Sequence, residues 1–136
     1  MKIMLDTNVL VSAFISKGGT ISKMIEILTE TDCHSIVLSS YVLHELKEVA
    51  KEKFPAKQPE LDIFLTNLPF EFAYTPDMLD KDKYPLLRDS TDLPVLASAI
   101  MEDVDVLLTG DKDFLVLELE RPAILSPAQF VKKFQQ

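Results

Sequence analysis

Apolar runs of four or five residues alternate along the chain with longer stretches in which apolar positions recur every three or four residues. The chain begins with such a run at 2–5, and residues 8–16 then follow a helical spacing until Gly18 and Gly19 interrupt it. Short apolar or alternating runs predict strands, and the longer spacing predicts amphipathic helices. Strands are therefore expected at 2–5, 35–39, 70–74, 105–109 and 123–127, and helices at 8–16, 20–30, 41–54, 60–68, 93–101 and 127–134.

Two segments between these elements are rich in proline and polar residues. Residues 55–59 predict a turn, and residues 75–92 predict a loop with one helical turn. Strands that alternate with helices at this spacing predict an α/β fold with three layers, α/β/α, around a central, mainly parallel sheet of about five strands. A length of 136 residues is most simply one domain over 1–136.

Two aspartates stand where predicted strands end. Asp6 follows the first apolar run directly, and Asp111 lies just past the run at 105–109. In an open parallel sheet, ligands bind outside the carboxyl ends of the strands. Although they are far apart in the sequence, the two side chains could face the same crevice.

Glu45 lies on the helix predicted for 41–54, at the border of its apolar stripe. At about 100° per residue, Glu45 falls about 100° from the centre of that stripe, whereas Glu48 falls about 160° from it. Glu45 is also not three residues after Ser39 or Ser40, the candidate caps of this helix, so it is not placed as a capping-box acid. Glu45 is therefore expected to lean toward a cleft, and Glu48 is expected to face solvent.

Asp92 directly precedes the helix predicted for 93–101, with Pro94 in a position suited to a first turn. Each of the four acids also has a purely structural explanation. Asp6 and Asp92 can cap helices, Asp111 can belong to a turn after Gly110, and Glu45 can be a solvated residue on a helix flank. Only their combination indicates a functional site.

The composition argues against several kinds of functional site. Hydrophobic residues make up 47% and charged residues 26%, as in a globular protein. Cys33 is alone and there are two histidines, which argues against a disulfide and against zinc held by Cys and His, and fits a reducing cytoplasm. No apolar stretch is long enough for a membrane helix or a secretory signal. With three glycines there is no phosphate-binding glycine loop.

The net charge of −8, from 14 basic and 22 acidic residues, disfavours general nucleic-acid binding, since phosphates are bound mostly by Lys and Arg. Several carboxylates brought close together repel one another, and a hard divalent cation such as Mg2+ or Mn2+ relieves that repulsion. Because bound metal inverts the local charge, the acidity leaves a metal-dependent nuclease open. His34 and His44 are expected at the surface and not in catalysis.

Four stretches carry these acids in order: "LDTNVL", "LHELKEV", "DSTDLPVLASA" and "LLTGDKDF". Together they resemble the ordered acid motifs of the PIN-domain ribonuclease family, over nearly the whole chain. More narrowly, the sequence is similar to the PIN-domain toxins of bacterial and archaeal toxin–antitoxin systems. The resemblance implies a PIN-like fold and a metal-dependent endoribonuclease, a hydrolase that uses water as its nucleophile and leaves a 5′-phosphate and a 3′-hydroxyl.

The resemblance also implies roles for individual residues. The catalytic acids, which hold Mg2+ or Mn2+, would be Asp6, Glu45, Asp92 and Asp111. The supporting residues would be Thr7, Asn8, Thr109, Asp113 and Asp89. Thr7 or Asn8 would steady the first acid and Thr109 would line the site. Asp113 is the alternative to Asp111 as the fourth acid, and Asp89 is the alternative to Asp92.

The partners implied by the resemblance are an RNA substrate and a small antitoxin protein that blocks the acidic cleft, in the cytoplasm and without a membrane. The resemblance is also compatible with a homodimer. Candidate contacts to RNA phosphates are Lys17, Arg88 and Lys112, which lie beside the acid motifs. For each of the lysines, a solvated surface side chain is the default interpretation.

Three other classes of protein share parts of this pattern. A phosphatase of another α/β family, the haloacid-dehalogenase type, would need a second acid where Asn8 stands. A response-regulator receiver would carry paired acids after its first strand and a lysine late in the chain. Neither explains Glu45. A PIN-fold interaction module with weak or no nuclease activity remains the main alternative, since the net acidity would suit a basic partner segment.

Overall fold

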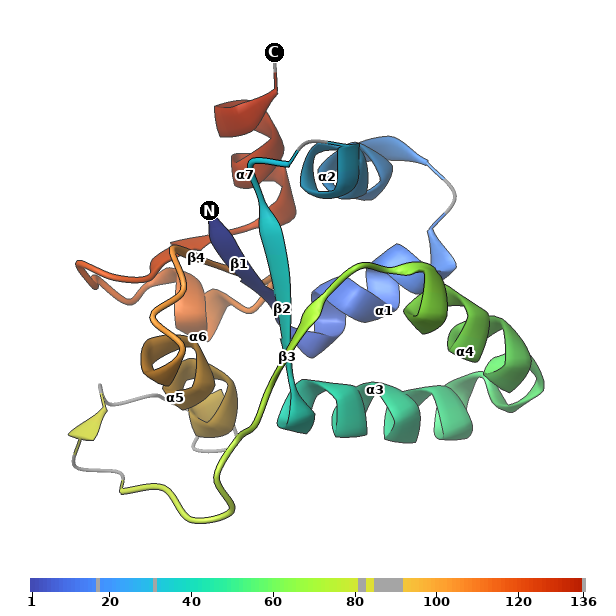
Figure 1. The fold of residues 1–136 in the computed structure, drawn as a ribbon, viewed down its shortest axis with the longest axis horizontal. Helices are drawn as coiled ribbons and strands as arrows, with labels where there is room; N and C mark the ends of the chain where they lie inside the picture. Colours follow the sequence, from blue (N-terminus) through green and yellow to red (C-terminus); the bar gives the residue numbers. More distant parts are fainter. Residues whose placement is uncertain (17, 31, 81–82, 85–91, 136) are drawn as a thin grey trace.

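Five short strands form one parallel sheet in the computed structural model, which describes residues 1–16, 18–30, 32–80, 83–84 and 92–135 (Figure 1). The order of the strands in the sheet is β3-β2-β1-β4-β5, and all four pairings are parallel. The strands are β1 (Lys2–Leu5), β2 (Ser35–Ser39), β3 (Glu71–Ala73), β4 (Val106–Leu108) and β5 (Ala123–Leu125). All five coincide with apolar runs expected to form strands, and the sheet is parallel throughout.

Helices cover both faces of the sheet. In Figure 1, α1, α3 and α4 lie on one side of the strands and α5 and α6 on the other, while α7 packs against α2. The helices are α1 (Thr7–Ile15), α2 (Gly19–Glu30), α3 (Ser40–Lys53), η1 (Pro55–Lys57), α4 (Gln58–Asn67), α5 (Leu93–Met101), α6 (Lys112–Leu115) and α7 (Pro127–Phe134). The expected three-layer α/β/α fold is thus confirmed.

The three inner strands are apolar because helices bury them from both faces. Met4, Leu38 and Leu107, one from each of β1, β2 and β4, have no solvent exposure. Strands buried on both faces read as continuous apolar runs and lack the alternation of a half-exposed strand. β1 lies at the centre of the sheet, and the chain continues from it first to β2 and β3 on one side and later to β4 and β5 on the other. Such a reversal of strand order creates a crevice at the carboxyl ends of the strands.

Two expectations about local structure need correction. Residues 55–59, expected as a turn, form the 3-10 helix η1 and the first residues of α4, with Pro59 in the first turn of α4. Proline fits there because the first helical residues need no N–H partner within the helix. A short helix, α6, was not expected at all; its four residues are too few to show a helical period. Half of the loop expected over 75–92, namely residues 81–82 and 85–91, lies outside the described residues.

None of the helices in the described part of the chain has both the length and the apolar character needed to cross a membrane.

Candidate functional site

The carboxyl ends of β1 and β4 bring the first acid next to a buried threonine. Leu5 is paired with Leu108 in the sheet, so Asp6 and Thr109 follow side by side. The backbone N–H of Asp6 donates to the carbonyl of Leu108 over 2.9 Å. The Thr109 hydroxyl donates to Oδ2 of Asp6 over 2.8 Å, while Oδ1 accepts from the N–H of Thr7 over 2.7 Å and caps α1. Both oxygens of Asp6 are therefore fixed in direction.

Thr109 also connects Asp6 with the fourth acid. Its Oγ1 accepts a hydrogen bond of 3.0 Å from the N–H of Asp111, so one buried hydroxyl contacts both segments. Asp111 is the N-cap of α6, and its Oδ1 accepts from the N–H of Asp113 over 2.8 Å. Asp111 is thus the N-cap of a short helix and not part of the turn that the sequence suggested, and Thr109 places it beside Asp6.

Glu45 reaches the same place from α3. Its Oε1 accepts a hydrogen bond of 2.6 Å from the hydroxyl of Thr7, the residue that follows Asp6. Glu45 is half-buried while Glu48 is exposed, as the helical geometry predicted. α3 begins directly after β2 with Ser39 as its N-cap, and β2 is the neighbour of β1. Position 45 therefore lies just over one turn into a helix that starts at the carboxyl edge of the sheet.

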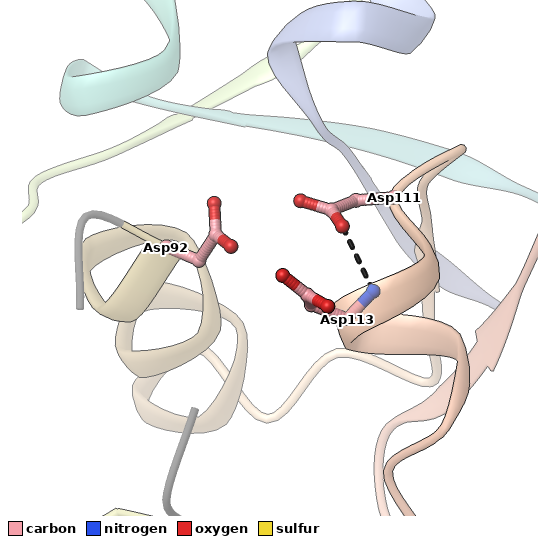
Figure 2. A group of neighbouring side chains, drawn as sticks. All are labelled: Asp92, Asp111 and Asp113. Atoms are coloured by element: carbon pink, nitrogen blue, oxygen red, sulfur yellow. Dashed lines mark hydrogen bonds between the residues drawn. The ribbon is translucent and has the colours of Figure 1, made fainter. Parts of the chain in front are cut away.

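Asp92, Asp111 and Asp113 form a group of three carboxylates (Figure 2). One oxygen from each lies within 4.8 Å of the others, and all three residues are half-buried. Asp92 occupies the N-cap position of α5 but makes no side-chain capping hydrogen bond. Its carboxylate is instead directed toward Asp111 and Asp113, which come from the end of β4 and the start of α6 (Figure 2). The capping explanation of Asp92 is therefore wrong.

Negative charge accumulates around Asp6. Burial raises the pKa of its carboxyl above the ordinary value, the hydrogen bonds from Thr109 and Thr7 partly oppose that shift, and the charges of Glu45 and Asp111 raise the pKa further. Asp6 is 7% exposed. A buried carboxylate that is surrounded by other acids is stabilised by a proton or a cation.

Tyr41 belongs to the same region, although it was not expected there. Burial raises the pKa of its hydroxyl, as do the charge of Glu45 and a hydrogen bond to Glu45; Asp92 and Asp6 add smaller effects in the same direction. Tyr41 precedes Glu45 by four residues on α3, so the two lie on one face of the helix. That spacing was the signal in the sequence that would have placed Tyr41 beside the site.

The donor set suits a hard divalent cation. All of the charged groups are carboxylates, and Mg2+ and Mn2+ prefer oxygen ligands. Three carboxylate oxygens in one group supply the charge, while Asp6 and Glu45 lie beside that group and hydrogen-bond to Thr109 and Thr7. Since one oxygen of Asp92 is fully buried, part of the group is shielded from solvent. The residues present therefore fit a bound metal ion.

The other residues singled out in the sequence have mixed positions. Asn8 is exposed, and the contacts expected of Thr7 or Asn8 come from Thr7. Lys112 is exposed on α6, next to Asp111 and Asp113. Asp89, Lys17 and Arg88 lie outside the described residues.

The two histidines differ from each other. His44 is exposed, as expected. The surface position expected for His34 is wrong, because its ring is half-buried against Phe130 and Phe134 of α7, with ring centroids 6.2 Å and 5.8 Å away. His34 precedes β2, so it lies at the opposite end of that strand from the start of α3 and contributes nothing to the acidic site.

The fold and the ordered acids agree with comparisons to known proteins. Residues 2–113 match the family model described as PIN domain, and the chain therefore belongs to the PIN-domain family. The fold is similar to that of a solved structure, VapBC2 from Rickettsia felis bound to a DNA fragment from their promoter, with a TM-score of 0.68. The two chains are 24% identical, and the likeness covers 93% of this chain and 98% of the other. No curated protein matches the sequence significantly.

Proposed function

We propose that this protein is a metal-dependent endoribonuclease that hydrolyses phosphodiester bonds of RNA. The observation that carries the proposal is the convergence of five carboxylates from four separate parts of the chain. Asp6 follows β1, Glu45 lies on α3, Asp92 precedes α5, and Asp111 and Asp113 lie at the end of β4 and the start of α6. Family membership supports the proposal, since PIN domains are generally nucleases.

The residues proposed to hold Mg2+ or Mn2+ are Asp92, Asp111 and Asp113, with Asp6 and Glu45 as the neighbouring acids. A divalent ion bound by such acids lowers the pKa of a water molecule and offsets the charge that develops on the phosphoryl oxygens. With water as the nucleophile, the reaction needs no 2′-hydroxyl, and the products would be a 5′-phosphate and a 3′-hydroxyl.

The surrounding hydroxyl groups have a positioning role in this proposal. Thr109 directs one oxygen of Asp6, and Thr7 holds Glu45 through its side chain and Asp6 through its backbone. Reactive groups that are already oriented lose little free energy on reaching the geometry of the transition state. Because these hydrogen bonds connect the ends of β1 and β4 with α3, the rigidity of the sheet extends to the acids.

We also propose that the enzyme is the toxin of a toxin–antitoxin pair. The likeness to the VapBC2 structure supports this proposal, and so does the group of neighbouring carboxylates in a chain with a net charge of −8. The antitoxin would be a small protein that covers the acids, and a basic segment of it would be attracted to them. Growth arrest on expression, relieved by the product of an adjacent small gene, would test this role.

The nuclease is tested by incubating single-stranded RNA with the protein in Mg2+, in Mn2+ and in EDTA. Cleavage is expected in one or both metals and not in EDTA. Asp6→Asn and Asp111→Asn should each lower the rate by about 100- to 1000-fold, because the metal contributes several kcal/mol to catalysis.

Glu48→Gln is the matched control, since it removes an exposed carboxylate from the same helix as Glu45. If both aspartate variants cleave as fast as the parent, these acids are not catalytic. If the parent cleaves neither RNA nor single-stranded DNA in any metal but retains a tight protein partner, the interaction module replaces the nuclease.

A further inference from the structure

A cavity of about 420 Å3 lies next to the acids, between the start of α3, the segment after β3 and the start of α5. Its size is within the range of pockets that hold small molecules. The lining residues that matter for its chemistry are Tyr41, His44, Thr75, Asp77, Leu79 and Pro94. Of the elements around the cavity, α3 also carries Glu45, and α5 begins directly after Asp92.

Tyr41 lies between the cavity and the acids. Its side chain lines the cavity, and its hydroxyl hydrogen-bonds to Glu45. On the other side of the cavity, Pro94 is two residues from Asp92. A nucleotide whose phosphate lies at the acids therefore has this cavity within reach of its neighbouring base.

Hydrogen bonds hold Thr75, a buried residue of the cavity lining. The N–H of Thr75 donates to Oγ of Ser40 over 2.8 Å, and the Thr75 hydroxyl is 2.7 Å from Oγ of Ser98 on α5. Thr75 is buried, so these contacts fix the segment after β3 against both α3 and α5. Thr75, where the lining segment after β3 begins, is therefore held in place without a ligand.

The chemistry of the lining favours a base over a phosphate. Tyr41, Leu79 and Pro94 present flat or apolar surfaces, and unstacked RNA bases are bound by stacking on aromatic side chains and by hydrogen bonds to their edges. The polar residues of the rim are His44 and Asp77, both exposed. A phosphate would be repelled by Asp77, whereas the amino group of a base can donate to it.

We propose that this cavity binds one nucleobase of the RNA beside the scissile phosphate and thereby sets the base preference of the enzyme. The inference rests on the proposed nuclease function. Because an ionised aspartate only accepts hydrogen bonds, Asp77 favours guanine, whose adjacent N1–H and amino group can both donate to one carboxylate, over adenine, cytosine and uracil, which each offer one donor group at that edge.

The test is the cleavage of a randomised RNA oligonucleotide pool in Mn2+, with sequencing of the products. The parent should prefer guanine over the other bases by about 5- to 100-fold at one fixed position next to the cut, the range expected for one bidentate contact to a base. Asp77→Asn should reduce that discrimination, and Leu79→Trp, which fills the cavity, should lower kcat/KM for all sequences.

Asp62→Asn is the matched control. Asp62 is an exposed aspartate on α4 that does not line the cavity, and its replacement removes the same charge. Cleavage by the parent with a base profile that Asp77→Asn and Leu79→Trp leave unchanged would overturn this inference alone. Failure of the parent to cleave any oligonucleotide would overturn the nuclease function itself, and cleavage of single-stranded DNA only would overturn the assignment to RNA.

Discussion

The hydroxyl of Thr109 donates a hydrogen bond of 2.8 Å to Oδ2 of Asp6 and joins the ends of two neighbouring strands at the acidic site. Oγ1 of Thr109 also accepts a hydrogen bond from the N–H of Asp111, so a single buried oxygen positions two acids that are far apart in the sequence. An uncharged residue thus has a central place among the carboxylates of the site.

Thr109→Val should weaken both stability and cleavage. Valine has nearly the same shape but leaves the N–H of Asp111 and one oxygen of Asp6 without their partner. The loss of such a buried contact costs about 1–3 kcal/mol in the free energy of unfolding, which urea titration measures. Thr109→Ser, which keeps the hydroxyl, should restore most of the stability and the cleavage rate.

Thr66→Val is the control for this substitution. Thr66 is an exposed threonine on α4, and its hydroxyl donates to a carbonyl of its own helix. Its replacement should change the free energy of unfolding by less than about 0.5 kcal/mol. Equal losses of stability at positions 66 and 109 would show that the hydrogen bonds of Thr109 to Asp6 and Asp111 add nothing to the free energy of unfolding beyond those of an exposed threonine.

Divalent metal should stabilise the folded protein. A ligand at 100 times its Kd adds about 2.7 kcal/mol when it binds only the folded state, and for a chain of this size that raises the Tm by about 10 °C. Addition of Mn2+ to metal-free protein should therefore shift the thermal melting curve upward. Asp111→Asn should abolish most of the shift, whereas the exposed substitution Glu48→Gln should retain it. A full shift in Asp111→Asn would contradict the proposed metal site.

Asp113 should contribute to metal affinity as well as Asp111. Its carboxylate lies in the same group of three with Asp92, so Asp113→Asn is expected to weaken Mn2+ binding by about 10- to 100-fold. Isothermal titration of metal into the two single variants compares the two positions directly. An unchanged affinity in Asp113→Asn would leave Asp111 as the only acid that acts at this end of β4.

The pH dependence of stability should reveal the raised pKa of Asp6 in EDTA. A carboxyl whose pKa is higher in the folded than in the unfolded chain stabilises the fold fully below the unfolded value, about 3.9, and this contribution is lost as the pH rises through the folded pKa. The free energy of unfolding of the parent minus that of Asp6→Asn should therefore decrease between pH 3 and pH 7. Urea unfolding at several pH values measures the difference, with Asp62→Asn as the reference for losing one exposed carboxylate. A difference that grows with pH would refute the shift.

Much of the fold could be predicted because its signals are local. β1, β2, α5 and α7 coincide with the expected ranges, since each is a run of apolar or amphipathic residues bounded by a polar or proline residue. α6 could not be predicted, because a helix of four residues is set by the Asp111 cap and by its contact with β5 and not by a period.

The candidate site was predictable in part for a similar reason. The positions of Asp6 and Asp111 follow from the rule that ligands bind at the carboxyl ends of parallel strands, and Glu45 follows from helical geometry. The position of Asp113 relative to Asp92 depends on how α5 and α6 lie across the crevice, which no local pattern encodes. Tyr41, by contrast, could have been placed beside the site from its spacing of four residues to Glu45 on α3.

The strand order has a consequence for the synthesis of this protein. β1 lies between β2 and β4 in the sheet. β4, however, is synthesised long after β1 and β2, and the segment that follows it supplies Thr109, Asp111 and Asp113. A chain that is still growing on the ribosome therefore has Asp6, Glu45 and Asp92 but lacks Asp111 and Asp113 until the segment after β4 has emerged. If the proposed ribonuclease function is correct, the enzyme would thus stay harmless to the message and the ribosome that produce it until nearly its whole sequence had been translated.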